Sequence, residues 1–250
     1  MRIATETSLS PGWLLIAFPA VLYPTYLLLE VLFGRGLAAA TDFAGADFEA
    51  GMVPLWTTSL GCVSMMGVYV ARGTFRDLGA LRQVLAGGEA AYADVQQQLT
   101  RFSRRRLWVG GLILLAFFGL RAELAIGRWT ELLAGEWSLR ATCIVAAGAT
   151  VFIMVGWLTV YLIDSARVYS RIGEKHVAVD LLDLGPLLPL TRHGLRIVLF
   201  LTILVAVGGI VWLLGPQTTR GSQSILWFLN FAWYVVVAGA AFVLPVRGLR

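Results

Sequence analysis

The polar side chains that fall inside long apolar stretches are the first candidates for chemistry. An ionisable group within a membrane is costly to place there, so such residues usually serve a function. Counted at the helical rise of about 1.5 Å per residue, they gather in the outer third of a bilayer, at Glu30, Thr57, Thr58, Ser59, Arg121, Thr142 and Asn230. One hypothesis is an outward-facing polar cavity in which Glu30 pairs with Arg121. The simpler interpretation, which we favour, is that both side chains reach lipid headgroups from the ends of their stretches.

No residue pattern typical of an enzyme accompanies these side chains. The sequence lacks a phosphate-binding glycine loop, an HExxH or GxSxG motif and a carboxylate pair inside an apolar stretch. His176, Asp180 and Asp183 would share one face only if their segment is helical, and loop histidines are more often solvated than bound to metal. We therefore expect no enzymatic activity, no metal and no cofactor.

The composition indicates the kind of protein in which these residues act. Of the 250 residues, 58% are hydrophobic and 14% are charged, and the mean hydropathy is +0.76. A soluble domain has about 25% charged residues, so a soluble enzyme, a disordered chain and a disulfide-stapled module are excluded. The composition predicts an all-α, polytopic bundle of membrane helices.

Six stretches are long enough to cross a bilayer as helices, which takes about 20 residues for about 30 Å of hydrocarbon. They cover residues 12–33, 52–71, 107–126, 141–163, 197–214 and 225–246. We predict one transmembrane domain over 1–250, with helical cytoplasmic loops at 72–106 and 164–196. A competing interpretation of the first stretch is a signal peptide cleaved near Ala38–Ala40. Cleavage would leave five spans and an outside N-terminus.

The placement of positive charge predicts the orientation. Of the 20 Lys and Arg residues, 15 lie on the side that holds both termini and both long loops. Because basic loops stay inside, both termini are predicted to be cytoplasmic. The excess of arginine over lysine suggests a GC-rich genome and hence a bacterial inner membrane. The net positive charge of the predicted cytoplasmic side is explained by contact with anionic inner-leaflet lipids, so no nucleic-acid partner is expected.

The two cytoplasmic loops carry apolar residues at helical spacing. In the first loop, Gly87–Gly88 interrupts the pattern and a stripe of Tyr92, Val95, Leu99 and Phe102 follows. The simpler interpretation is that these helices extend the neighbouring spans, and the alternative is a docking hairpin on the inner leaflet. The basic residues that would contact the membrane surface or a partner are Arg72, Arg76, Arg82, Arg101, Arg104, Arg105, Arg106, Arg192 and Arg196. In the second loop, residues 180–189 predict a short interfacial helix, and faint similarity between the loops hints at a repeated unit.

These features favour a sensory, signalling or scaffolding membrane domain. Its outer polar zone would receive a signal, and its arginine-rich cytoplasmic helices would transmit or dock it. A kinase, cyclase or coiled coil encoded after Arg250 would favour sensing. The alternative is a channel or passive transporter for an ion or small solute. The expected partners are the lipid bilayer and, since small residues within the stretches permit close packing, a second copy or another membrane or cytoplasmic protein.

Overall fold

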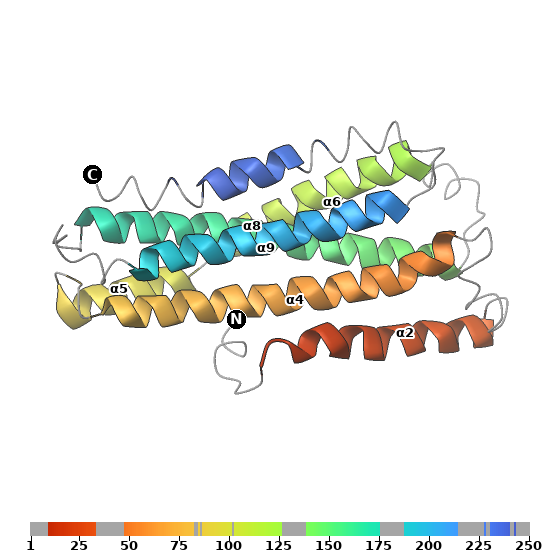
Figure 1. Ribbon diagram of the computed structural model, residues 1–250, viewed down its shortest axis with the longest axis horizontal. Helices are drawn as coiled ribbons and strands as arrows, with labels where there is room; N and C mark the ends of the chain where they lie inside the picture. Colours follow the sequence, from red (N-terminus) through yellow and green to blue (C-terminus); the bar gives the residue numbers. More distant parts are fainter. Residues whose placement is uncertain are drawn as a thin grey trace.

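The computed structural model describes residues 10–33, 48–82, 85, 87–101, 103–126, 139–175, 188–214, 228, 231–240 and 243. Within these ranges every regular element is a helix, which confirms the predicted all-α class. The elements are α2 (Trp13–Phe33), α4 (Phe48–Leu81), α5 (Gly88–Thr100), α6 (Arg104–Ile126), α8 (Leu139–Lys175) and α9 (Leu188–Leu214), with a further helical stretch at 231–240. The long helices lie roughly along one axis as a bundle (Figure 1).

Two helices are much longer than the apolar stretches from which they were predicted. Helix α4 has 34 residues and α8 has 37, which correspond to about 51 and 55 Å at the helical rise. The first predicted loop is therefore largely helical, because α4 continues to Leu81 and α5 follows after a break. Gly88 lies at that break with φ of +55°, a backbone conformation that glycine adopts without strain. The helix over the second apolar stretch thus continues to Leu81, as the simpler interpretation expects, whereas residues 176–187 of the second loop lie outside the described residues.

One segment in the described part of the chain is long and apolar enough to cross a membrane. It covers Thr142–Ile172, with a mean hydropathy of 2.2 in its most apolar part, and Trp13–Leu29 and Phe231–Ala240 form shorter apolar helices. The structure therefore supports one candidate membrane-spanning helix. The six-span topology stays a prediction.

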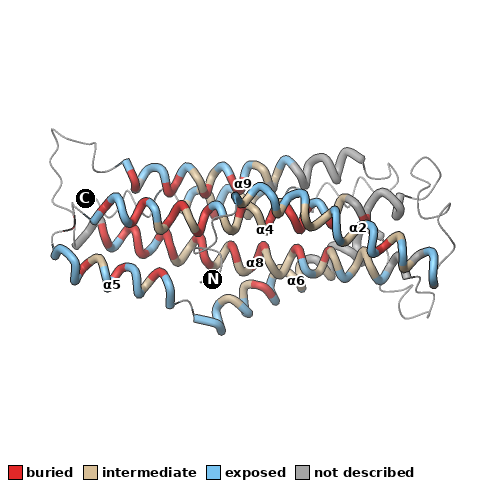
Figure 2. Tube along the Cα trace, turned by 90° about the horizontal axis from the view of Figure 1, so that it is seen from below, coloured by how far each residue is buried: buried red, intermediate tan, exposed pale blue. Residues whose placement is uncertain are grey.

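Buried side chains form two separate apolar clusters. The first core lies between the middle portions of α4, α8 and α9 and includes Leu60, Val70, Leu162 and Phe200. The second core lies at the α5 end of the bundle and joins Leu78, Leu81, Leu85, Ala91, Val95, Leu99, Val168, Tyr169 and Ile172. Figure 2 shows many of the buried residues of α4 and α8 toward the α5 end. Helices α4 and α8 thus contribute to both cores.

The apolar stripe predicted for the first loop is the face by which α5 joins the second core. Val95 and Leu99 are buried and Tyr92 packs at the edge of the cluster, whereas Phe102 lies outside the described residues. Arg82 forms an ion pair with Glu89 at 2.5 Å across the break between α4 and α5. The stripe therefore faces other helices of the same chain.

A glycine contact brings α6 and α8 close together. A Cβ atom added to Gly156 would overlap the backbone of Gly110 and Gly111. The two helix backbones can touch only because these positions carry no side chain, as in close packing of membrane helices. The prediction of close packing at small residues is confirmed within the chain at this crossing.

Candidate functional site

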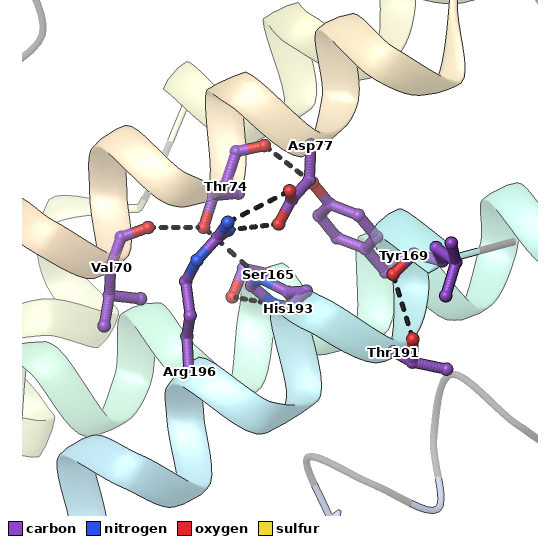
Figure 3. Close-up of polar contacts among 9 residues, drawn as sticks. Val70, Thr74, Asp77, Ser165, Tyr169, Thr191, His193 and Arg196 are labelled. Carbon is purple, nitrogen blue, oxygen red and sulfur yellow. Dashed lines mark hydrogen bonds and ion pairs between the residues drawn. The ribbon is translucent and has the colours of Figure 1, made fainter. Parts of the chain in front are cut away.

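A layer of polar side chains separates the two apolar cores. It takes two residues from each of three helices, which supply Thr74 and Asp77 from α4, Ser165 and Tyr169 from α8, and His193 and Arg196 from α9. Each pair is three or four residues apart, so both side chains lie on the same face of their helix. We call these six residues the polar layer, and Figure 3 shows how they converge. Burial of this many polar groups requires that their hydrogen-bonding atoms be matched.

Asp77 and Arg196 form a two-pronged ion pair between α4 and α9. Arg196 Nη1 contacts Asp77 Oδ2, and Nη2 lies 3.2 Å from Oδ1. The exposed fractions of the two side chains are 4% and 15%. Burial raises the pKa of the Asp77 carboxyl, and the hydrogen bond and charge of Arg196 partly oppose that effect. Paired donors and acceptors of this kind fix orientation as well as charge.

Gly73 gives the Arg196 side chain its path across α4. A Cβ atom at this position would lie 2.5 Å from Arg196 Nη1 and 2.7 Å from its Cδ. A Cβ atom does not approach non-bonded heavy atoms this closely, so the guanidinium would have to move. The ion pair therefore depends on the absence of a side chain at Gly73.

His193 is held between α4 and α8. Its Nδ1 lies 3.3 Å from Thr74 Oγ1, and its Nε2 lies 3.2 Å from Ser165 Oγ. The imidazole stacks on the ring of Tyr169, with the ring centroids 4.3 Å apart. All three neighbours are buried, and His193 itself has no exposed surface. The ring is fixed from two sides and over one face.

The hydroxyl groups beside His193 have second acceptors of their own. Thr74 Oγ1 lies 2.9 Å from the carbonyl oxygen of Val70, and Ser165 Oγ lies 3.0 Å from that of Leu162. Four contacts therefore compete for three hydrogens, because a neutral imidazole and two hydroxyls carry one each. An imidazolium would fill all four contacts. Burial nevertheless lowers the pKa of His193 to about 3, and the charge of Arg196 acts in the same direction, so the ring is neutral near pH 7 and one contact remains incomplete.

A further hydrogen bond joins α8 directly to the α4 backbone. The Tyr169 hydroxyl donates to the carbonyl oxygen of Thr74 at 2.7 Å.

Ser165 is fully buried, so its contact with His193 does not present a nucleophile to a substrate. The chemistry available to the polar layer is therefore ion pairing, directional hydrogen bonding and the binding of a proton, which together fix the mutual register of three helices.

The residues proposed from the sequence for an outer polar cavity are only partly described. Thr57 and Ser59 are buried, and Ser59 Oγ donates to the Leu55 carbonyl oxygen at 2.8 Å. Thr58 and Thr142 are exposed, while Asn230 and the side chains of Glu30 and Arg121 lie outside what the structure describes. The cavity therefore stays a prediction. Thr57 is 17 residues from Thr74, about 25 Å along α4, so the polar layer is a different site.

The basic residues proposed as a docking surface divide into three groups. Arg72 is half-buried, and Arg196 belongs to the polar layer instead of the surface. The exposed members are Arg76, Arg82, Arg101, Arg104, Arg105, Arg106 and Arg192. The segment of His176, Asp180 and Asp183 lies outside the described residues, and the described part of the chain holds no group of three His, Cys, Asp or Glu side chains placed to bind a metal.

Sequence reasoning missed most of the polar layer, although a signal was present. Asp77 lies seven residues after Val70, with Thr74 between them, which places all three on one helix face. That face continues into Leu78 and Leu81 of the second core. A charge within a buried stripe indicates a charged partner, and Arg196 was the matching residue.

Comparison of the chain with known protein families, with curated proteins and with solved structures found no match.

Proposed function

We propose that this chain is a multi-pass protein of a bacterial inner membrane that acts as a signalling or scaffolding domain. Its six spans are those expected from the sequence, with both termini in the cytoplasm. The observation that carries the proposal is the continuity of α4 and α8, which run unbroken from the first core, through the polar layer, into the second core. A displacement of either helix within the membrane would move the second core with it, because a helix transmits motion as a stiff element.

The predicted span ends give the polar layer a location relative to the membrane. Thr74 and Ser165 lie three and two residues beyond the predicted spans that end at 71 and 163, about 3 to 5 Å past the hydrocarbon. On this placement the polar layer sits at the level of the inner headgroups. The first core lies within the bilayer, and the second core extends into the cytoplasm.

The polar layer has the properties of a coupling element between these two parts. Apolar packing alone tolerates small shifts between helices, whereas the Asp77–Arg196 pair and the contacts of His193 fit one register. Buried ion pairs contribute little net stability and in some proteins select one arrangement. We therefore assign the polar layer the role of setting the position of the cytoplasmic helices relative to the spans.

The first experiment tests the membrane placement. Single cysteines at Gln96 in α5 and at Thr142 near the outer end of α8, both exposed, are introduced into a chain with Cys62→Ser and Cys143→Ser. A membrane-impermeant maleimide should label Gln96→Cys only in inside-out vesicles and Thr142→Cys only in right-side-out vesicles. Labelling of both positions from one side would overturn the proposal.

The second experiment tests coupling. Spin labels at Gln96 in α5 and Thr191 in α9 report the distance between these helices in proteoliposomes. We expect one narrow distance distribution, which broadens or shifts on Asp77→Asn and stays unchanged on Arg104→Gln, a charge change at an exposed position outside the polar layer. An unchanged distribution in both variants would contradict the coupling role. Ion or small-solute flux carried by the protein and absent from empty vesicles would instead support the channel or passive transporter.

A further inference from the structure

Two arginines from different helices converge on one carboxylate oxygen near the start of α6. Arg106 Nη1 lies 3.5 Å and Arg167 Nη1 lies 3.2 Å from Asp164 Oδ1. The Asp164 side chain is 15% exposed, whereas those of Arg106 and Arg167 are 66% and 57% exposed. A single carboxylate neutralises one of the two guanidinium groups, so the trio keeps a positive charge and several N–H donors that face outward.

More positive charge surrounds this trio. Arg104 and Arg105 precede Arg106 at the start of α6, and Arg171 lies one turn beyond Arg167 on α8, all of them exposed. The summed charge attracts anions to this end of α6 and α8. Guanidinium groups bind phosphate oxygens through paired N–H donors, which a carboxylate at the same place only partly occupies.

An exposed apolar stripe begins within one turn of Arg106. Trp108, Val109, Leu112 and Ile113 are exposed by 54%, 48%, 55% and 60%, and their spacing places them along one side of α6. The indole of Trp108 is held by edge-on packing against Trp157, at 5.1 Å between ring centroids. The opposite side of α6 carries Gly110 and Gly111, which face α8. The stripe therefore points away from the bundle.

We propose that Arg106 and Arg167 bind the phosphate of one anionic phospholipid, whose acyl chains lie along Trp108, Leu112 and Ile113. A cluster of arginines alone fits any anion, and an apolar helix face alone fits any lipid. Here the arginine cluster lies at the start of the apolar stripe, as the phosphate of a phospholipid lies at the start of its acyl chains. The inference rests on the proposed membrane placement, and it extends the general contact with anionic lipids to a defined site that includes Arg167 and Asp164.

The test measures lipid retention by native mass spectrometry of the full chain purified in a zwitterionic detergent. Phosphatidylglycerol and phosphatidylcholine are titrated in parallel, together with inorganic phosphate and glycerophosphoglycerol, the headgroup without acyl chains. We expect one phosphatidylglycerol per chain to be retained, at least about tenfold more tightly than phosphatidylcholine. Both lipids carry a phosphate, but the choline cation of phosphatidylcholine would be repelled by the surplus positive charge of the surrounding arginines. Phosphate and the free headgroup should bind far more weakly. Binding of either as tight as that of the lipid would overturn the lipid assignment.

Matched variants separate a defined site from general charge attraction. Arg106→Gln/Arg167→Gln should lose the preference for phosphatidylglycerol, whereas Arg82→Gln/Arg192→Gln removes the same charge from exposed positions elsewhere and should keep it. Equal loss in both variants would overturn the site. Should the first variant fail to fold, Arg106→Gln alone carries the test and should lower retention severalfold, and no change in retention would overturn the site.

A labelling control distinguishes this site from the membrane placement on which it rests. A cysteine at Ser103, directly before α6 and exposed, should react from the cytoplasmic side. If it does and no lipid preference appears, the lipid site is wrong while the placement stands. If it reacts from the outer side, both are wrong.

Discussion

The ring of Tyr169 lies parallel to the imidazole of His193, with ring centroids 4.3 Å apart and an angle of 8° between the planes. Tyr169 thus covers one face of the imidazole, while the two ring nitrogens contact Thr74 Oγ1 and Ser165 Oγ. Tyr169 also belongs to the second core. One aromatic side chain thus connects the cytoplasmic core to the polar layer, and its hydroxyl reaches the α4 backbone as well.

Removal of one partner of the Asp77–Arg196 pair should destabilise the fold. Asp77→Ala leaves the largely buried Arg196 guanidinium without its carboxylate, and breaking a buried pair in this way costs about 3 kcal/mol or more. Unfolding in mixed micelles monitored by circular dichroism measures the loss. The double variant Asp77→Ala/Arg196→Met should lose less free energy of unfolding than the sum of the losses in the two single variants. Additive losses would show that the two residues do not interact.

The exposed ion pair of Arg82 and Glu89 provides the control for that experiment. Both side chains are more than half exposed, and surface pairs contribute little because water screens them. Arg82→Gln/Glu89→Gln should therefore leave the unfolding transition almost unchanged. A loss as large as that of Asp77→Ala would show that charge removal in general, and not the buried pair, is responsible.

Gly73→Ala should act on the fold through Arg196. The added Cβ would meet the Arg196 side chain at 2.5 Å, so the guanidinium must leave Asp77 or α4 must shift, at a cost of about 1 to 3 kcal/mol. The substitution should cost much less in an Arg196→Met background. Gly79→Ala is the matched control on the same helix, since a Cβ there meets nothing within 4 Å. It should be neutral or stabilise by up to about 1 kcal/mol.

Stability should fall as the pH is lowered because His193 is buried in its neutral form. Its pKa in the folded chain is about 3, compared with about 6.5 when unfolded. The unfolded chain therefore binds the extra proton first, and stability is complete above about pH 6.5 and declines from there toward pH 3. The slope approaches about 1.4 kcal/mol per pH unit for this one group.

The contribution of His193 is measured by comparison with His193→Gln. Asp77 also titrates, and its raised pKa acts in the opposite direction on stability. Subtracting the pH profile of the variant from that of the wild type removes this common contribution. Unfolding profiles from pH 7 to pH 4 with the same slope for both proteins would show that His193 is not buried in its neutral form.

The crossing of α6 and α8 should not accept a side chain at its centre. Gly156→Leu would push the two backbones apart at Gly110 and should lower the free energy of unfolding by about 1 to 3 kcal/mol. Gly67→Ala is the comparison, because its Cβ would lie 3.7 Å from Leu158 Cδ1, an ordinary contact. Similar losses in the two variants would contradict a close crossing at Gly156.

The helices could be predicted from the sequence because each depends on local pattern. The apolar stretch at 12–33 coincides with α2, and the stripe through Val95 and Leu99 faces a core, as its spacing requires. The interruption expected at Gly87–Gly88 coincides with the start of α5, although α4 already ends at Leu81. Glycine favours such a break through its own backbone freedom. These features need no knowledge of neighbouring helices.

The polar layer could not be predicted in the same way because it depends on the register of three helices. Asp77, Ser165 and Arg196 all lie just beyond the apolar stretches, in segments assigned to loops. Outside the apolar stretches the helical rise gives no depth, so the charges of Asp77 and Arg196 indicate only a membrane surface. Arg196 in particular could be distinguished from the exposed Arg192 only by knowing that α9 packs its Arg196 face against Asp77.

The unbroken passage of α4 from one core to the other constrains the number of residues between them. Val70 lies in the first core and Leu78 in the second, and each helical residue adds about 100° of rotation. A single inserted residue between them would turn Leu78 and Leu81 away from their neighbours even if its side chain were harmless. An insertion of seven residues would nearly restore the phase. In this segment the length of the chain carries as much structural information as its composition.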